Sequence, residues 1–211
     1  MRTHRSIVRA TCAAAGLTVL LTLSACGGEE AEKPQELSET EHNKADVAFA
    51  TDMIQHHAQA MSMVDMTMDR DLDPEVQGLA DGIRAAQSPE IETMSGWLQQ
   101  WGEEVPSTMR DHVNGGHEGH GDDESSMSDA MKDMDDMPGM MSAEDMEALE
   151  KASDAEFEDM WLEMMVEHHQ GAIEMSETEQ DSGRFKPAVD LAGTVIETQS
   201  DEIDTMEKLL G

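Results

Sequence analysis

Residues 53–63 read MIQHHAQAMSM, and residues 165–175 read MVEHHQGAIEM. The second stretch follows the first at an offset of 112 residues (53 to 165), and the same offset aligns QSPEIETM at 87–94 with QSDEIDTM at 199–206. A gapless match that extends over about fifty residues indicates an internal repeat. The chain therefore carries one structural unit twice, and paired histidines mark each copy.

Apolar residues of the first repeat recur at the three- and four-residue intervals of an amphipathic helix. This pattern predicts a first helix from about Asn43 to about Met68. Asp73, followed by proline, predicts the start of a second helix that ends by Gly102. Proline inside a helix costs on the order of 3 kcal/mol, so we expect a kink at Pro89 within one bent helix.

The second repeat predicts the same arrangement after a short additional helix. Ser142–Asp145 and Ser153–Glu156 both read as capping boxes, the second at the start of a long helix that runs to about Glu179. Phe185–Leu210 then repeats the second helix of the first unit. No strand pattern is present in the sequence. The predicted fold class is all-α: two duplicated helical hairpins that pack into one four-helix bundle.

The amino terminus resembles a bacterial lipoprotein signal. Residues 1–25 combine three arginines with an apolar run, and LSAC at 23–26 matches a lipobox. The resemblance implies cleavage before Cys26, lipidation of its sulfur and anchoring to a membrane. An ordinary signal peptide is the first alternative. A transmembrane helix is a weaker one, since the apolar run is about half of what a spanning helix needs. We expect an exported protein, lipid-anchored to the outer face of the cell membrane or in the periplasm.

Composition divides the remaining chain into a tether, two repeats and a linker. Low apolar content predicts a flexible acidic tether, and a Met/His/Asp-rich stretch interrupts the repeats. The predicted segments are the tether at 26–42, the first hairpin repeat at 43–102, the linker at 103–141 and the second hairpin repeat at 142–211, with 43–211 as one domain.

Charge and cysteine content exclude several function classes. Loss of the three signal arginines takes the formal net charge from −34 to −37, which excludes nucleic acid as a partner and favours cations. Lipidation of Cys26 leaves no cysteine for a disulfide, a thiolate site or a nucleophile. The sequence also contains no recognisable Ser-His-Asp arrangement or Gly-rich phosphate loop.

The paired histidines fall on the apolar face of their helices. Met53 and Met61 each lie one turn from His57, and thioether beside imidazole suits copper, particularly Cu(I). The alternative is a polar core network in which the histidines remain neutral and bond to inward polar residues of the other helices. Metal-bound histidine often donates to such a partner, so the two readings are compatible. The candidate partners are Gln87, Glu90, Gln199 and Glu202.

Methionine also recurs in the linker, where acidic sequence predicts no core for it to fill. We therefore expect the linker to capture copper, with an oxidisable low-complexity tether as the alternative. The candidate linker residues are His117, His120, Met127, Met131, Met134, Met137, Met140 and Met141.

The two His-His stretches, the QSPEIETM and QSDEIDTM segments and MPGMM at 137–141 resemble the bacterial family known as domain of unknown function 305. The resemblance implies a ferritin-like four-helix bundle, exported from the cytoplasm, with some members that bind copper and support copper resistance. Ile173 stands where the first repeat has Met61, so the two halves need not bind equally. The metal ligands that the resemblance implies are His56, His57, His168, His169, Met53, Met61, Met63, Met165 and Met175.

The favoured function is an exported, lipid-anchored protein that is not an enzyme and that binds or sequesters copper, as Cu(I) and also as Cu(II), in copper homeostasis or resistance. A ferritin-like di-metal oxidoreductase is one alternative. Its usual Glu-x-x-His spacing is missing, because methionine stands three residues before both His56 and His168. The other alternative is a structural lipoprotein without metal, whose histidines form a polar core network.

Overall fold

A computed structural model describes residues 36–108 and 137–211, and every structural statement below concerns these residues. The predicted signal peptide, the lipidation site and the first part of the tether lie outside the described residues. So do five of the candidate linker ligands. These predicted sites are Cys26, His117, His120, Met127, Met131 and Met134.

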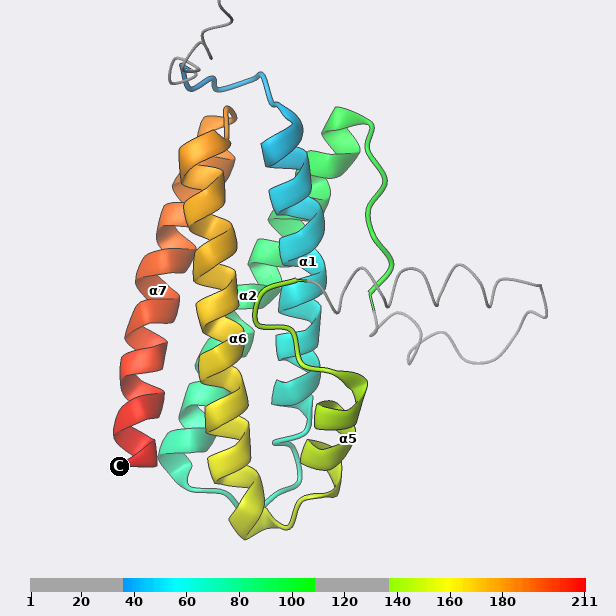
Figure 1. Ribbon diagram of the computed structural model, residues 1–211. Helices are drawn as coiled ribbons and strands as arrows, with labels where there is room; N and C mark the ends of the chain where they lie inside the picture. Colours follow the sequence, from blue (N-terminus) through cyan, green and yellow to red (C-terminus); the bar gives the residue numbers. More distant parts are fainter. Residues whose placement is uncertain (1–35, 109–136) are drawn as a thin grey trace, which may run out of the picture. The chain divides into compact units, whose positions relative to one another are not determined.

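The described residues fold into helices, as the sequence predicts (Figure 1). The first repeat forms α1 (Lys44–Asp65) and α2 (Pro74–Trp101), and the second forms α6 (Asp154–Ser182) and α7 (Lys186–Leu210). The short helix before α6 is α5 (Ala143–Lys151). The fold class is confirmed as an all-α bundle of duplicated hairpins, and α2 continues through its internal proline as one helix.

Helix ends follow the expected capping chemistry, but two helices differ in length from the prediction, and one of them is α6, which ends at Ser182, three residues after the predicted end at Glu179. Capping boxes begin α5 at Ser142 and α6 at Ser153, and Gly102 ends α2 with a φ of 77°. α1 ends at Asp65, three residues before the predicted end at Met68. The turn that follows α1 contains Asp69 in the left-handed region, with a φ of 66°, a conformation that no helix accommodates.

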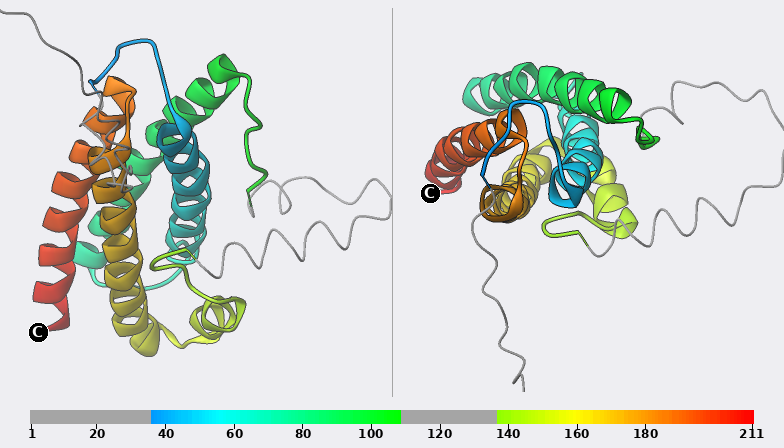
Figure 2. Two further views of the ribbon diagram at one scale, coloured as in Figure 1. Left: turned by 45° about the horizontal axis from the view of Figure 1, so that its top comes forward. Right: turned by 90° about the horizontal axis from the view of Figure 1, so that it is seen from above.

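The four long helices pack as two hairpins joined face to face (Figure 2). α1 packs against α2, α6 packs against α7, and the contact between α1 and α6 joins the hairpins. Apolar side chains form two clusters along the bundle. One cluster surrounds Trp161 and Met165, and the other surrounds Met53 and Phe185. Methionine side chains fill much of the first cluster and contribute Met53 and Met94 to the second, as the scarcity of aromatic residues predicts.

Each repeat caps a helix of the other through a carboxylate. Asp46 at the start of α1 accepts a hydrogen bond from Phe185 N at 2.8 Å, just before α7. Glu158 at the start of α6 accepts one from Asp73 N at 2.5 Å, just before α2. The offset of 112 residues relates the two carboxylates (46 to 158) and the two amides (73 to 185). These reciprocal bonds orient the hairpins symmetrically at both ends of the bundle.

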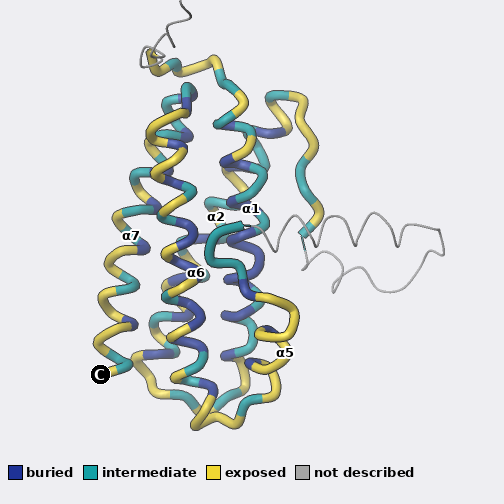
Figure 3. The backbone as a smooth tube through the Cα atoms, in the orientation of Figure 1, coloured by how far each residue is buried: buried dark blue, intermediate teal, exposed yellow. Residues whose placement is uncertain are grey.

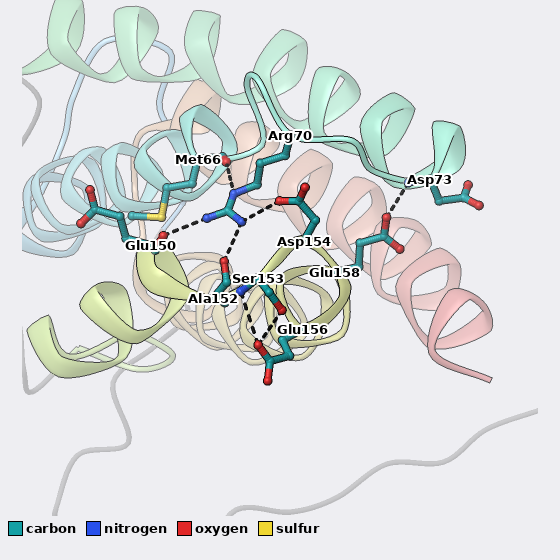
Figure 4. Close-up of polar contacts among 9 residues, drawn as sticks. All are labelled: Met66, Arg70, Asp73, Glu150, Ala152, Ser153, Asp154, Glu156 and Glu158. Atoms are coloured by element: carbon teal, nitrogen blue, oxygen red, sulfur yellow. Dashed lines mark hydrogen bonds and ion pairs between the residues drawn. The ribbon is translucent and has the colours of Figure 1, made fainter.

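Arg70 joins the loop after α1 to the α5–α6 turn, as Figure 4 shows. Its guanidinium donates to Met66 O at 3.1 Å and to Ala152 O at 2.8 Å, and it reaches the Asp154 carboxylate at 3.1 Å. The same cation lies 4.0 Å from the centre of the Phe157 ring. Because guanidinium donors form a rigid fork, these contacts fix the base of the bundle. Within the described residues, no helix is long and apolar enough to cross a membrane.

Candidate metal centre

The paired histidines form one buried layer halfway along the bundle. His56 and His57 lie on α1, His168 and His169 lie on α6, and all four side chains have an exposed fraction of 0%. Figure 3 shows the buried positions that run along α1 and α6 at this level. We call these four side chains the imidazole layer. Four polar rings in the core need partners, because an unpaired buried polar group costs about 1–3 kcal/mol.

Two members of the imidazole layer are held by carboxylates from the outer helices. His57 donates from Nε2 to Glu90 Oε2 on α2 at 2.8 Å. His169 donates from Nε2 to Glu202 Oε2 on α7 at the same distance. Both carboxylates are 14% exposed, so the two repeats build the same contact in the same environment. The predicted pairing of histidine with these two glutamates is confirmed.

The predicted pairing with the glutamines is wrong. Gln87 is buried, and neither its amide nitrogen nor its oxygen has a hydrogen-bond partner. Gln199 is equally buried, and its amide oxygen has no partner. The glutamates stand three residues later along each helix and reach the imidazoles instead. Both glutamines therefore add unsatisfied polar atoms to the core.

The other two histidines meet at the contact between the repeats. The ring centroids of His56 and His168 lie 3.7 Å apart with an interplanar angle of 39°. His56 Nε2 donates to the Pro138 carbonyl at 3.0 Å, whereas neither ring nitrogen of His168 has a partner. The Nδ1 atoms of the other three histidines also lack partners. Five imidazole nitrogens are thus buried without a hydrogen bond.

Burial keeps His56, His168 and His169 neutral. It lowers the pKa of His56 to about 3, reinforced by His57 and opposed by the bond to Pro138. It also lowers the pKa of His168 well below the usual 6.5, reinforced by the neighbouring histidines. The pKa of His169 is lowered by burial too, although Glu202 opposes the shift. A neutral imidazole has one N–H and one lone pair, so each of these rings offers a donor atom to a metal.

Methionines lie about one to two helical turns from the paired histidines along α1 and α6. Met53, Met61, Met63 and Met165 have an exposed fraction of 0%, and Met175 is half-buried. By helical spacing, Met53 and Met61 flank His57 on α1. Met61 Sδ accepts a 3.6 Å hydrogen bond from the Ser88 hydroxyl of α2. The predicted soft donors are therefore packed in the same core as the histidines.

The chain segment before α5 crosses the imidazole layer from outside. We call residues 137–141 the strap. Its Pro138 carbonyl lies over Gly171 of α6, where an added Cβ would lie 2.0 Å from the carbonyl oxygen. The neighbouring Gly139 has a φ of 71°, and a Cβ added to it would lie 2.6 Å from Glu167 O. Only glycine at both crossing points permits this contact between backbones.

Gln59 of α1 fixes the other end of the strap. Its amide donates to Met141 O at 2.8 Å and accepts from Met141 N at 2.8 Å. Met141 is 8% exposed and belongs to the apolar core. The expectation that the whole methionine run lies outside the core is therefore wrong for Met141, while Met137 and Met140 are half-buried. Sequence reasoning also missed Gln59, although its position matches Gly171 at the repeat offset.

The donor set fits a soft metal ion better than a hard one. In the described parts of the chain, no three His, Cys, Asp or Glu side chains converge into a ready-made metal cluster. Glu90 and Glu202 are each bonded to their own histidine. Hard cations such as Mg²⁺ and Ca²⁺ need several oxygen ligands, whereas imidazole and thioether suit copper. The unpaired imidazole nitrogens are thus the atoms available to a metal.

Comparison with known families gives one match over most of the chain. The family model described as Domain of unknown function (DUF305) matches residues 46–210. A search of curated proteins gives no match.

Solved structures resemble the bundle closely. A DUF305 fragment from Deinococcus radiodurans is 27% identical, with a TM-score of 0.62 over 80% of this chain and 97% of its own. A DUF305 protein from Streptomyces coelicolor that is named as secreted is 30% identical, with a TM-score of 0.63 over 79% and 90%. CopM in a Cu(II)-bound form is 28% identical, with a TM-score of 0.58 over 78% and 95%. CopM also matches in Cu(I)-bound and Ag-bound forms.

Proposed function

The chain belongs to the DUF305 family, and on that premise we propose that it is an exported protein that binds and sequesters copper. The observation that carries the proposal is the imidazole layer, with five buried ring nitrogens that lack a hydrogen-bond partner. Copper-bound and silver-bound CopM structures of the same fold support it. Its place in the cell would be copper homeostasis or resistance.

Cu(I) is the favoured ion. Thioether and imidazole are the soft and borderline ligands that Cu(I) prefers, and the core supplies both types without a thiolate. His56, His57, His168 and His169 would hold the ion, with the flanking methionines as further donors. Cu(II) also binds imidazole, so the same layer would accept it more weakly through nitrogen alone. Glu90 and Glu202 would act by orienting His57 and His169.

A polar network without metal explains less of the geometry. The glutamates satisfy Nε2 of His57 and His169, and Pro138 satisfies Nε2 of His56. Every Nδ1 in the layer remains unsatisfied, which a network that serves stability alone would not leave. A di-metal oxidoreductase also fits poorly, because such sites need carboxylates that bridge two ions. Each glutamate here is hydrogen-bonded to one histidine.

Location and capture complete the proposal. The secreted relative supports export, and lipidation at Cys26 would hold the protein at the outer face of the membrane. The Met/His-rich linker would collect ions for the bundle.

Membrane fractionation of the full-length protein and of its Cys26→Ser variant tests whether a lipid at Cys26 anchors the protein. We expect the variant alone to move to the soluble fraction, and equal partition of both proteins would exclude lipid anchoring.

The decisive experiment is anaerobic Cu(I) titration of the chain that follows Cys26, in competition with a calibrated chelator. The test variant combines His56→Phe with His168→Phe, which keeps two adjacent aromatic rings and removes the ring nitrogens. The matched control is His42→Phe, which alters a histidine stacked on Trp101 at 4.4 Å outside the layer. We expect tight Cu(I) binding in the parent and the control, and weaker binding in the double variant.

Two outcomes would refute the proposal. If the parent chain does not bind Cu(I) tightly, the histidines have a purely structural role. Equal affinity in all three proteins would place any copper outside the imidazole layer. Circular dichroism of each variant checks that the bundle remains folded. A second set of variants without the linker methionines separates capture by the linker from binding in the core.

A further inference from the structure

The strap meets the imidazole layer at one side only, and its contacts differ between the repeats. Pro138 O accepts the Nε2 hydrogen of His56, while the equivalent histidine, His168, receives no such contact. A carbonyl oxygen accepts hydrogen bonds and never donates. His56 is therefore held in the tautomer that carries its proton on Nε2, with the lone pair on the buried Nδ1.

Two residues at equivalent positions of the repeats hold the strap in place. The repeat offset relates Gln59 to Gly171 (59 to 171). Gln59 clamps the backbone of Met141 with two hydrogen bonds of 2.8 Å. Gly171 leaves the space that the Pro138 carbonyl occupies, since its added Cβ would lie 2.0 Å from that oxygen. The first repeat thus attaches the strap through Gln59, and the second repeat leaves space for it at Gly171.

We propose that Gln59 is a positioning residue of the metal centre, which acts through the strap to fix the ring tautomer of His56. The chain of contacts runs from the Gln59 amide to the Met141 backbone, and from Pro138 O to His56 Nε2. It keeps the lone pair of His56 on Nδ1 before any metal arrives. The metal-binding part of this inference rests on the proposed function, whereas the tautomer is a property of the metal-free protein.

Two variants release the strap by different means. Gln59→Met keeps the length of the side chain and removes both hydrogen bonds to Met141. Gly171→Ala leaves every polar group in place and puts a methyl group where Pro138 O now lies. The matched control is Gly96→Ala, another glycine within a helix, where an added Cβ meets nothing within 4 Å. Gln59→Glu retains the acceptor for Met141 N and serves as the conservative variant.

The first measurement is made without metal. Long-range proton–nitrogen correlation spectra of ¹⁵N-histidine-labelled protein report which ring nitrogen carries the proton. We expect the Nε2–H tautomer at His56 in the parent and in Gly96→Ala, a mixture of tautomers in Gln59→Met and Gly171→Ala, and partial restoration in Gln59→Glu. An unchanged Nε2–H tautomer in both strap variants would overturn the proposal.

The second measurement is the affinity for Ag(I), a redox-stable probe of a Cu(I) site. Loss of a group that orients a ligand typically lowers metal affinity about 10- to 100-fold, and we expect this loss in both strap variants but not in Gly96→Ala. A changed tautomer with unchanged affinity would overturn the positioning role. Failure of the parent to bind Ag(I) would instead refute the proposed function, while the spectra would still test the tautomer.

Discussion

The two repeats build one half of the imidazole layer identically and the other half differently. His57 with Glu90 and His169 with Glu202 have the same 2.8 Å bond and the same exposure. His56, in contrast, donates to the strap, whereas both nitrogens of His168 lack a partner. Each shared contact uses two side chains of its own repeat. The difference comes from the strap, which is hydrogen-bonded to the imidazole layer through His56 alone.

This contrast shows where a duplicated bundle gains asymmetry. Contacts within each hairpin and the reciprocal caps at Asp46 and Glu158 follow the repeat, because both copies contain every atom that they need. The strap lies between the repeats in the sequence and contacts both α1 and α6. One chain segment cannot occupy two equivalent positions, so the residues at 59 and 171 have diverged to glutamine and glycine.

The largest predicted effect concerns a second asymmetric position, Glu179, which the repeat offset relates to Thr67 (67 to 179). Burial and the adjacent Asp46 raise the pKa of Glu179 from 4.5 to about 9. The folded protein therefore holds a proton that the unfolded chain releases near pH 4.5. The contribution of Glu179 to stability should be fully present below that pH and be lost as pH rises toward 9, with a slope of up to about 1.4 kcal/mol per pH unit.

Glu179→Gln should remove this slope and raise stability most at alkaline pH. Urea unfolding of the metal-free protein between pH 5 and 9 measures the difference, with the exposed Glu177→Gln on the same helix as the control. Equal pH dependence in the parent and Glu179→Gln would show that the carboxyl is ionised in the folded state. Thr67 has no titrating group, so no equivalent slope arises from the first repeat.

The next effect tests the symmetric half of the imidazole layer. Glu90→Ala and Glu202→Ala each leave a buried Nε2–H without an acceptor, which should cost about 1–3 kcal/mol. Because the two contacts match in distance and exposure, the two losses should be equal. Chemical unfolding of the metal-free protein measures them. Glu92→Ala and Asp204→Ala, at exposed equivalent positions, are the controls. A large difference between the two losses would contradict the symmetry of the layer.

The sequence predicts the symmetric contacts far better than the asymmetric ones. Helical periodicity places His57 and Glu90 on inward faces, and the repeat then assigns the same relation to His169 and Glu202. The strap contacts of His56 and Gln59 each span 82 residues and end in a segment without periodicity. Every residue has a backbone carbonyl, so the sequence does not identify the carbonyl of Pro138 as the hydrogen-bond partner of His56.

A smaller effect tests the asymmetric half of the layer in the metal-free protein. His56→Phe leaves Pro138 O unpaired, whereas His168→Phe removes two nitrogens that have no partner. Replacement of an unsatisfied polar group by an apolar one of similar shape is neutral or stabilising. We therefore expect His168→Phe to be more stable than His56→Phe by about 1–2 kcal/mol in thermal and urea unfolding. Equal stability of the two variants would mean that the Pro138 contact contributes nothing.

The smallest effect concerns Met61, the only methionine of the stretch at 53–63 that has no counterpart in the stretch at 165–175. Ile173 of α6 stands where Met61 stands in α1, and Ile173→Met would give both halves the same thioether. Exchange of apolar residues of similar volume usually costs less than about 1.5 kcal/mol, so the fold should tolerate it. If the thioethers beside the imidazole layer bind copper, Cu(I) affinity should rise a few-fold, while Ile173→Leu should leave it unchanged. An equal response to methionine and leucine would assign position 173 to packing and restrict the donor asymmetry to the strap and the histidines.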